Sequence, residues 1–384
     1  MRRLSEIDAL RGLMLVLMTL THMPTRFSDP LGQPLGFVSA AEGFVFLSAF
    51  LAAYIGTGRA RAAGESAMRR WLWGRWGTVY ACHAGLLAFL FLVVVPIGAA
   101  REQPAITNLA SHFLRSPAWA AGQSLAMLYN PPLLDILPLY TVFLAVTPWV
   151  LAFAHRRGWV LPLAASASVW ALAQLGVGEM FFDVLRYVFG FDLPYRQTGS
   201  FSFLAWQMVW MLGLWTGHAF ATTPPEDHRP PRWVGIIALG YEAVWFIWRH
   251  TTGQVPEPHG GALNALFDKW SLGPMRLLDF IALMVAVLAL WPRNARWLVP
   301  SWLAWLGRAT LPAFCAHLVV CMLALAFFGA ANPARPVWID VALLAAAFAA
   351  VFAATALATS LRARPRGVRP LPAVARRRPG VAPW

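Results

Sequence analysis

The chain has 384 residues, of which 59% are hydrophobic and only 12% are charged, and it contains 20 Trp and 25 Phe. This composition is too apolar for an ordinary soluble globular protein and indicates a polytopic membrane protein. A formal net charge of +14 could suit nucleic-acid binding, but the arginines stand beside apolar segments or in the C-terminal tail. Membrane topology and anionic headgroups explain them better, so we expect membrane lipids as partners and no nucleic acid.

The three cysteines, Cys82, Cys315 and Cys321, all lie in apolar stretches. This placement argues against a disulfide framework and against a spaced metal site, so we predict no metal centre. The N-terminus lacks the short apolar core and small-residue cleavage site of a signal peptide, and we expect its first apolar segment to be retained.

Ten apolar segments are long enough to cross about 30 Å of hydrocarbon. They lie near residues 8–26, 36–57, 73–97, 132–154, 158–176, 200–221, 232–250, 273–291, 301–328 and 337–361. We therefore predict an all-α, polytopic integral membrane protein with about ten transmembrane helices in one bundle, formed by residues 1–361. Residues 362–384 are rich in Arg and Pro, and we predict a disordered, basic cytoplasmic tail.

The distribution of arginines predicts the orientation. If the N-terminus is cytoplasmic, most of the 31 basic residues fall on the inner side, as the positive-inside rule requires. Both termini would then be cytoplasmic. The opposite side would hold the segments 26–35, 99–131, 176–199 and 251–273, whose polar, aromatic and Pro/Gly residues suit an external site, although each alone could be an ordinary interfacial loop.

The first apolar segment, residues 7–24, carries Asp8, Arg11 and His22 in an otherwise apolar sequence. In a helix, the step from Arg11 to His22 is about three turns, so both side chains face one way, roughly 16 Å apart. Ionisable residues inside spans usually face a bundle interior or a water-filled cavity. The alternative interpretation is an interfacial arginine and a structural histidine.

Glu42 falls near the outer end of the second segment, on the side where the first segment places His22. A carboxylate that accepts a hydrogen bond from one imidazole nitrogen would orient the other as a general base. We therefore predict a catalytic pair of His22 and Glu42.

Five stretches, in order, resemble a known family. DALRG, with Arg11 and His22 separated by ten residues, resembles the Arg-x10-His signature of the acyltransferase-3 superfamily of membrane acyltransferases. The other four are AEGFVFLSAFLAAY at 41–54, LLDILPLYTVFLAVTP at 133–148, WQMVWMLGLWTGHA at 206–219 and LGRATLPAFCAHLVV at 306–320. Together they resemble the OpgC branch, whose members succinylate osmoregulated periplasmic glucans. Where many superfamily members read Ser-Gly-Phe, this chain reads SAF at 48–50, a small departure.

The resemblance implies an O-acyltransferase of the bacterial inner membrane, which transfers acyl groups other than amino-acyl groups. The acyl group, succinyl in this branch, would pass from cytoplasmic acyl-CoA, a co-substrate, to hydroxyls of a periplasmic glucan, with no permanently bound cofactor. It makes His22 the essential histidine, acting as general base, with a covalent acyl-histidine as the alternative. Arg11 would bind the donor, or else form a structural salt bridge with Asp8 or Glu6.

A basic cluster precedes the third apolar segment, and Arg69, Arg70 and Arg75 are its members closest to that segment. These arginines would help to bind the phosphates of CoA at the inner mouth. The alternative is that they only anchor the topology.

Further polar residues lie in the quoted motifs. Asp135 and Tyr140 could hydrogen-bond the sugar or seal the acceptor site. Ser48 and His317 could line the acyl channel, although a lone His in a packed bundle is more often structural.

Two other functions remain open from the sequence. An acetyltransferase of another surface polysaccharide or lipid would share the mechanism. A non-enzymatic transporter or exporter of an anionic or sugar compound would use the same ionisable residues to line a path, but no obvious repeat or pair of broken helices supports it. The sequence predicts no oligomeric state.

Overall fold

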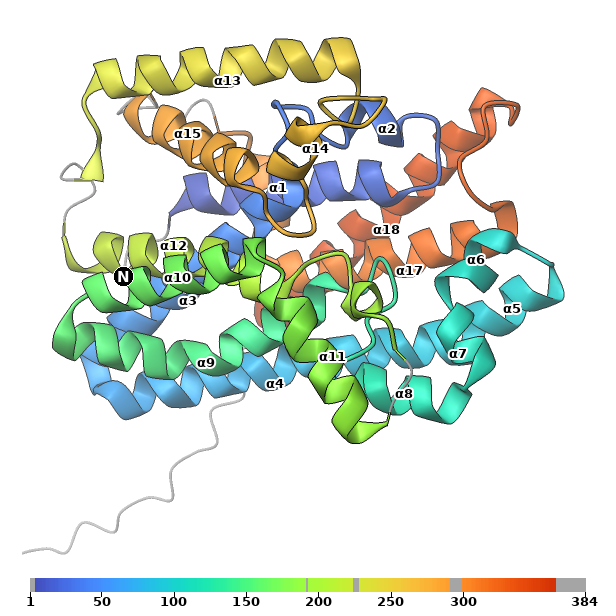
Figure 1. Cartoon of the computed structure of the whole chain (residues 1–384), viewed down its shortest axis with the longest axis horizontal. Helices are drawn as coiled ribbons and strands as arrows, with labels where there is room; N and C mark the ends of the chain where they lie inside the picture. Colours follow the sequence, from blue (N-terminus) through green and yellow to red (C-terminus); the bar gives the residue numbers. More distant parts are fainter. Residues whose placement is uncertain (1–3, 191–192, 224–227, 291–298, 364–384) are drawn as a thin grey trace, which may run out of the picture.

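The computed structural model describes residues 4–190, 193–223, 228–290 and 299–363, and these are helical apart from loops and one isolated β-bridge between Leu35 and Val38. Most long helices lie roughly side by side, while α11 runs obliquely to them (Figure 1). The predicted all-α class is therefore confirmed for the described residues. The proposed tail lies outside them from residue 364 onward.

Five described helices are long and apolar enough to span a membrane. They are α3 (Ala40–Ala63), the continuous run Glu65–Ala100, α9 (Ile136–Arg157), α17 (Thr310–Phe328) and α18 (Val337–Ala363). A sixth is added if α10 (Val160–Gln174) and α11 (Val177–Phe189), bent by 75°, form one span. A membrane protein is thus supported, whereas the predicted number of about ten spans is not confirmed.

The remaining long helices occupy predicted spans but are shorter or more polar. α1 and α13 carry acidic and basic residues, and α15 has only 17 residues. Their bounds are Ser5–His22 for α1, Phe203–Thr222 for α12, Arg232–Thr252 for α13 and Pro274–Leu290 for α15, and the seven-residue α16 (Ser301–Gly307) precedes α17.

Short helices gather in the segments predicted to be external. They are α2 (Ser28–Leu31), α6 (Pro104–Leu109), α7 (Ser111–Arg115), α8 (Pro117–Leu125), α14 (Ala262–Leu266) and the 3₁₀ turn η2 (Tyr195–Thr198). The run Glu65–Ala100 reaches them through α4 (Glu65–Phe89), the π-helical turn η1 (Leu90–Val94) and α5 (Val95–Ala100). Figure 1 shows α6 to α8 at one end of the bundle and the α3–α4 connection at the other.

Glycines bring two pairs of helices into close contact. A side chain at Gly12 of α1 would collide with the backbone of Leu303 in α16, and one at Gly307 would collide with the backbone of Asp8. Gly217 of α12 faces the backbone of Phe50 in α3 in the same way. Small residues allow such backbone approach between helices in membranes. The first contact fixes α1 against α16 at the level of Arg11.

Candidate active site

His22 is the last residue of α1, and two residues of α17 form hydrogen bonds with it. Its Nδ1 lies 3.0 Å from Nε2 of His317, and the two rings stack with centroids 5.3 Å apart and an interplanar angle of 17°. The thiol of Cys321, one turn further along α17, donates to the backbone carbonyl of His22 over 2.8 Å. The imidazole therefore has a defined position and orientation.

The arrangement also selects a tautomer for each histidine. Nδ1 of His317 is buried and faces the carbonyl groups of Ala313 and Phe314, at a geometry outside that of a regular hydrogen bond. Carbonyls only accept, so a proton on this Nδ1 is favoured, and Nε2 of a neutral His317 is then an acceptor. Nδ1 of His22 must donate to it. Nε2 of His22 consequently keeps its lone pair free, as a general base requires.

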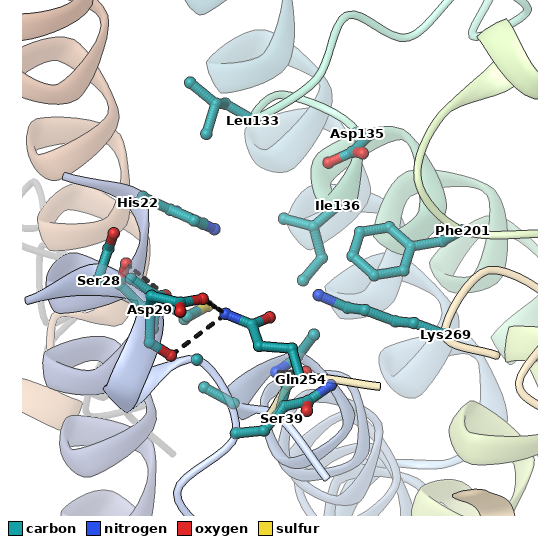
Figure 2. A pocket seen from close by; sticks show the side chains of 16 residues that line it. His22, Ser28, Asp29, Ser39, Leu133, Asp135, Ile136, Phe201, Gln254 and Lys269 are labelled. Carbon is teal, nitrogen blue, oxygen red and sulfur yellow. Dashed lines mark hydrogen bonds between the residues drawn. The ribbon is translucent and has the colours of Figure 1, made fainter. Parts of the chain in front are cut away.

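His22 faces a cavity of about 280 Å³. In Figure 2, its ring points into the cavity from α1, and the side chains of Asp135, Phe201 and Lys269 approach from the opposite side. Other lining residues come from the turn after α1, from the start of α3 and from the loop after α13; they include Ser28, Asp29, Gln33, Ser39 and Gln254. The predicted external segments thus supply much of the lining.

Glu42 is not the partner of His22, and this part of the sequence-based prediction is wrong. Its carboxylate forms a fully buried salt bridge with Arg276 of α15, with 2.5 Å between Oε1 and Nε. It also accepts from the backbone N–H and the hydroxyl of Ser39, over 3.0 and 2.7 Å, as part of a capping box at the start of α3. The carboxylate is therefore engaged by Arg276 and Ser39, because a buried arginine needs a compensating charge.

Asp135, just before α9, lines the cavity. One of its oxygens accepts from the backbone N–H of Ser200 over 2.8 Å, which ties α9 to the loop that precedes α12. Gly199 has φ +128° and packs against Asp135, so the turn depends on glycine there. Burial raises the pKa of Asp135, while the bond from Ser200 opposes this shift.

Lys269 is a cavity residue that the site predictions missed. It is the single lysine of the chain, and it lies in the loop between α14 and α15. Burial lowers the pKa of its ammonium group, whereas the nearby carboxylates of Glu42 and Asp135 act in the opposite direction. Its rarity in an arginine-rich chain was the one available signal.

Arg11 lies three helical turns from His22, inside the bundle, and is buried. Its Nη1 donates to the carbonyl of Gly307 over 3.1 Å, and its Nε has no hydrogen-bond partner among the described residues. Arg75 lies near enough for the two positive charges to repel, and Nε of Arg75 donates to the hydroxyl of Tyr140 over 3.5 Å. Two arginines thus lie within electrostatic range of each other inside the bundle, an arrangement suited to an anion.

Four other predicted residues lie away from the cavity. Tyr140 accepts a hydrogen bond from Arg75 and does not line the cavity, so a direct contact with the acceptor there is not supported. Arg69 forms a surface salt bridge with Glu65, and Arg70 is exposed. Ser48 is buried in α3 outside the cavity. Among the described residues, no group of three or more His, Cys, Asp or Glu side chains could hold a metal ion.

A family model described as OpgC protein matches residues 3–363, nearly the whole chain. The chain belongs to the OpgC family. Membership in the OpgC family supports a glucan-modifying acyltransferase at the level of the family, and the matched region contains every residue of the cavity and of the arginine pair. Searches of curated proteins and of solved structures found no match.

Proposed function

We propose that the protein is an O-acyltransferase of the bacterial inner membrane that transfers a succinyl group from cytoplasmic acyl-CoA to hydroxyls of a periplasmic glucan. The observation that carries the proposal is the imidazole of His22, which has one nitrogen committed to His317 and the other directed to a cavity. A base that is oriented in this way suits transfer to a hydroxyl, because a hydroxyl must lose its proton as it attacks.

The distribution of arginines in the sequence supports an arrangement in the membrane. We propose that α1, α12, α13 and α15 cross the membrane beside the more apolar helices, with both termini cytoplasmic. The basic α3–α4 connection would then lie on the inner side. The cavity would open to the periplasm, and the pair of Arg11 and Arg75 would lie toward the cytoplasm.

The proposed reaction needs no change in redox state. The glucan oxygen attacks the thioester carbonyl carbon while Nε2 of His22 takes the hydroxyl proton. The tetrahedral intermediate collapses, the carbon–sulfur bond breaks, and the CoA thiolate leaves with the proton from His22. The products are an ester and a free thiol. His317 acts as a positioning residue, because its hydrogen bond fixes the orientation of His22.

Transfer can be tested with purified protein in liposomes of phosphatidylethanolamine and phosphatidylglycerol. Succinyl-CoA is added on the side proposed to be cytoplasmic, toward which Arg11 and Arg75 lie, and unmodified glucan is added on the other side. The glucan is then analysed by mass spectrometry. We expect glucan that carries succinyl esters, together with free CoA. Passage of glucan across the membrane without covalent change would show a transporter instead.

The donor end can be tested separately. Replacing Arg75 with glutamine removes a charge-assisted contact worth about 1.5–3 kcal/mol, so the KM for acyl-CoA should rise by about ten-fold or more while kcat changes little. Arg157→Gln, at an exposed arginine, is the matched control and should leave the KM unchanged. If CoA instead binds the basic cluster at the surface, Arg70→Gln will raise the KM as much as Arg75→Gln does.

A further inference from the structure

Lys269 lies in a rigid turn that aims its side chain into the cavity. The carbonyl of Lys269 accepts from the indole of Trp206 over 2.9 Å, and the carboxylate of Asp268 accepts from the backbone and hydroxyl of Ser271. The next residue, Trp270, accepts a backbone hydrogen bond from Ser202 over 2.9 Å. Such anchoring limits the conformations of the turn, so the ammonium group is presented in one region.

The ammonium of Lys269 has no hydrogen-bond or salt-bridge partner among residues 4–190, 193–223, 228–290 and 299–363. Its described contact is with the ring of Phe201, 5.4 Å from the centroid. The two nearest carboxylates are already engaged, Glu42 by Arg276 and Asp135 by Ser200. The side chain is only partly exposed, at the wall of the cavity, so its charge is incompletely solvated and has no protein partner to compensate it. The cavity therefore has a cation that is ready for an anionic ligand.

The position of this cation relative to His22 indicates which end of a ligand it would meet. Figure 2 shows the nitrogen of Lys269 and the ring of His22 pointing toward the same space from opposite walls. Lys269 is also near enough for its charge to act on the imidazole. On the proposed function, the acyl arm comes from the side of Arg11 with its thioester carbonyl at His22. Whatever extends beyond that carbonyl enters the cavity.

We propose that Lys269 determines acyl specificity by binding the distal carboxylate of a dicarboxylic acyl group. This inference rests on the proposed acyl transfer at His22. In a succinyl group, the carboxylate lies three bonds beyond the reacting carbon, which directs it across the cavity toward Lys269. An acetyl or butyryl group would leave the ammonium unpaired, so the site favours a donor that ends in a carboxylate.

The test compares succinyl-CoA with butyryl-CoA, which has the same four-carbon chain without the carboxylate. Lys269→Met keeps most of the side-chain volume and removes the charge. We expect kcat/KM for succinyl-CoA to fall by about 10- to 100-fold and kcat/KM for butyryl-CoA to stay within a factor of about three. Lys269→Arg restores the preference for succinyl-CoA, which shows that the charge is responsible.

A pH series adds a second readout. The groups that face Lys269 are His22 of α1, Glu42 of α3, Asp135 before α9 and Arg276 of α15. The lowered pKa of Lys269 means that its positive charge is lost as the pH rises through a range below that of a free lysine. The preference for succinyl-CoA should then decline in the wild type and persist in Lys269→Arg, since an arginine stays protonated.

The outcomes separate this inference from the proposed function. Equal losses with both donors in Lys269→Met would overturn it, and an increased KM for the glucan with either donor would assign Lys269 to an anionic group of the acceptor. A wild type that prefers butyryl-CoA would overturn the specificity and leave acyl transfer intact. Absence of transfer from every acyl-CoA would refute the proposed function itself. Thermal midpoints of the variants check that each is folded.

Discussion

His22→Gln is expected to lower kcat by about 10²–10⁴-fold, the usual contribution of a general base, while the protein still inserts and folds. Glutamine can still hydrogen-bond to His317, but it has no basic nitrogen that could accept a proton in the cavity. The measurement is the rate of CoA release with succinyl-CoA and glucan. His259→Gln, an exposed histidine in the loop after α13, is the matched control and should leave kcat unchanged.

The role of His317 is distinguished within the same experiment. His317→Ala removes the acceptor that orients His22, so kcat should fall with little change in either KM, and the dependence of kcat on pH should change. His317→Gln offers an amide oxygen to the same nitrogen of His22 and should recover part of the rate. If His22 forms an acyl-enzyme, rapid quenching of the wild type will trap a labelled histidine, which general-base catalysis does not produce.

Removing the charge of Glu42 is expected to destabilise the folded protein by about 3–5 kcal/mol, the usual cost of breaking a buried ion pair. Glu42→Gln leaves the guanidinium of Arg276 buried in α15 without its carboxylate partner; the other acceptor that the described residues offer it is the carbonyl of Phe267, at 3.4 Å. The thermal midpoint in detergent measures the effect. The double variant Glu42→Gln with Arg276→Met should recover most of the loss, because no uncompensated charge remains.

This experiment also decides the function of Glu42. If Glu42 is a structural link between α3 and α15, the thermal midpoint falls in Glu42→Gln and recovers in the double variant. If Glu42 is catalytic, Glu42→Gln loses activity while its thermal midpoint is unchanged. Glu65→Gln is the control for an ion pair at the surface. Glu65 contacts Arg69 and Arg156 on the outside of the bundle, where solvent screens the charges, so little change in stability is expected.

Local sequence patterns predicted the helices and which residues share a helix face, because these depend only on residues close together in the sequence. Helix periodicity placed Arg11 and His22 on one face of α1, and the apolar segments predicted the helices of the bundle. Asp135 was expected near the acceptor because it stands at the start of the fourth apolar segment, on the side predicted to be external. The predicted number of about ten spans is not confirmed, because helices such as α1 and α13 carry charged residues that lower their mean hydropathy.

Contacts between distant segments could not be predicted in this way. His22 and His317 are 295 positions apart, and Glu42 and Arg276 are 234 positions apart. Topology alone placed Glu42 and His22 at the same end, but it could not show that a buried arginine would take the carboxylate. Lys269 was missed because its loop has no regular period that would show the direction of its side chain.

The hydrogen bond between the two histidines has a chemical consequence for the competing hydrolysis of the product. The partner of His22 is a neutral ring, which stabilises a developing imidazolium less than a carboxylate would. Such a base can assist attack on a thioester, whose thiolate departs readily. It assists hydrolysis of the resulting oxygen ester less well, because an alkoxide is a poorer leaving group than a thiolate. The glucan ester would therefore be hydrolysed slowly in the same active site.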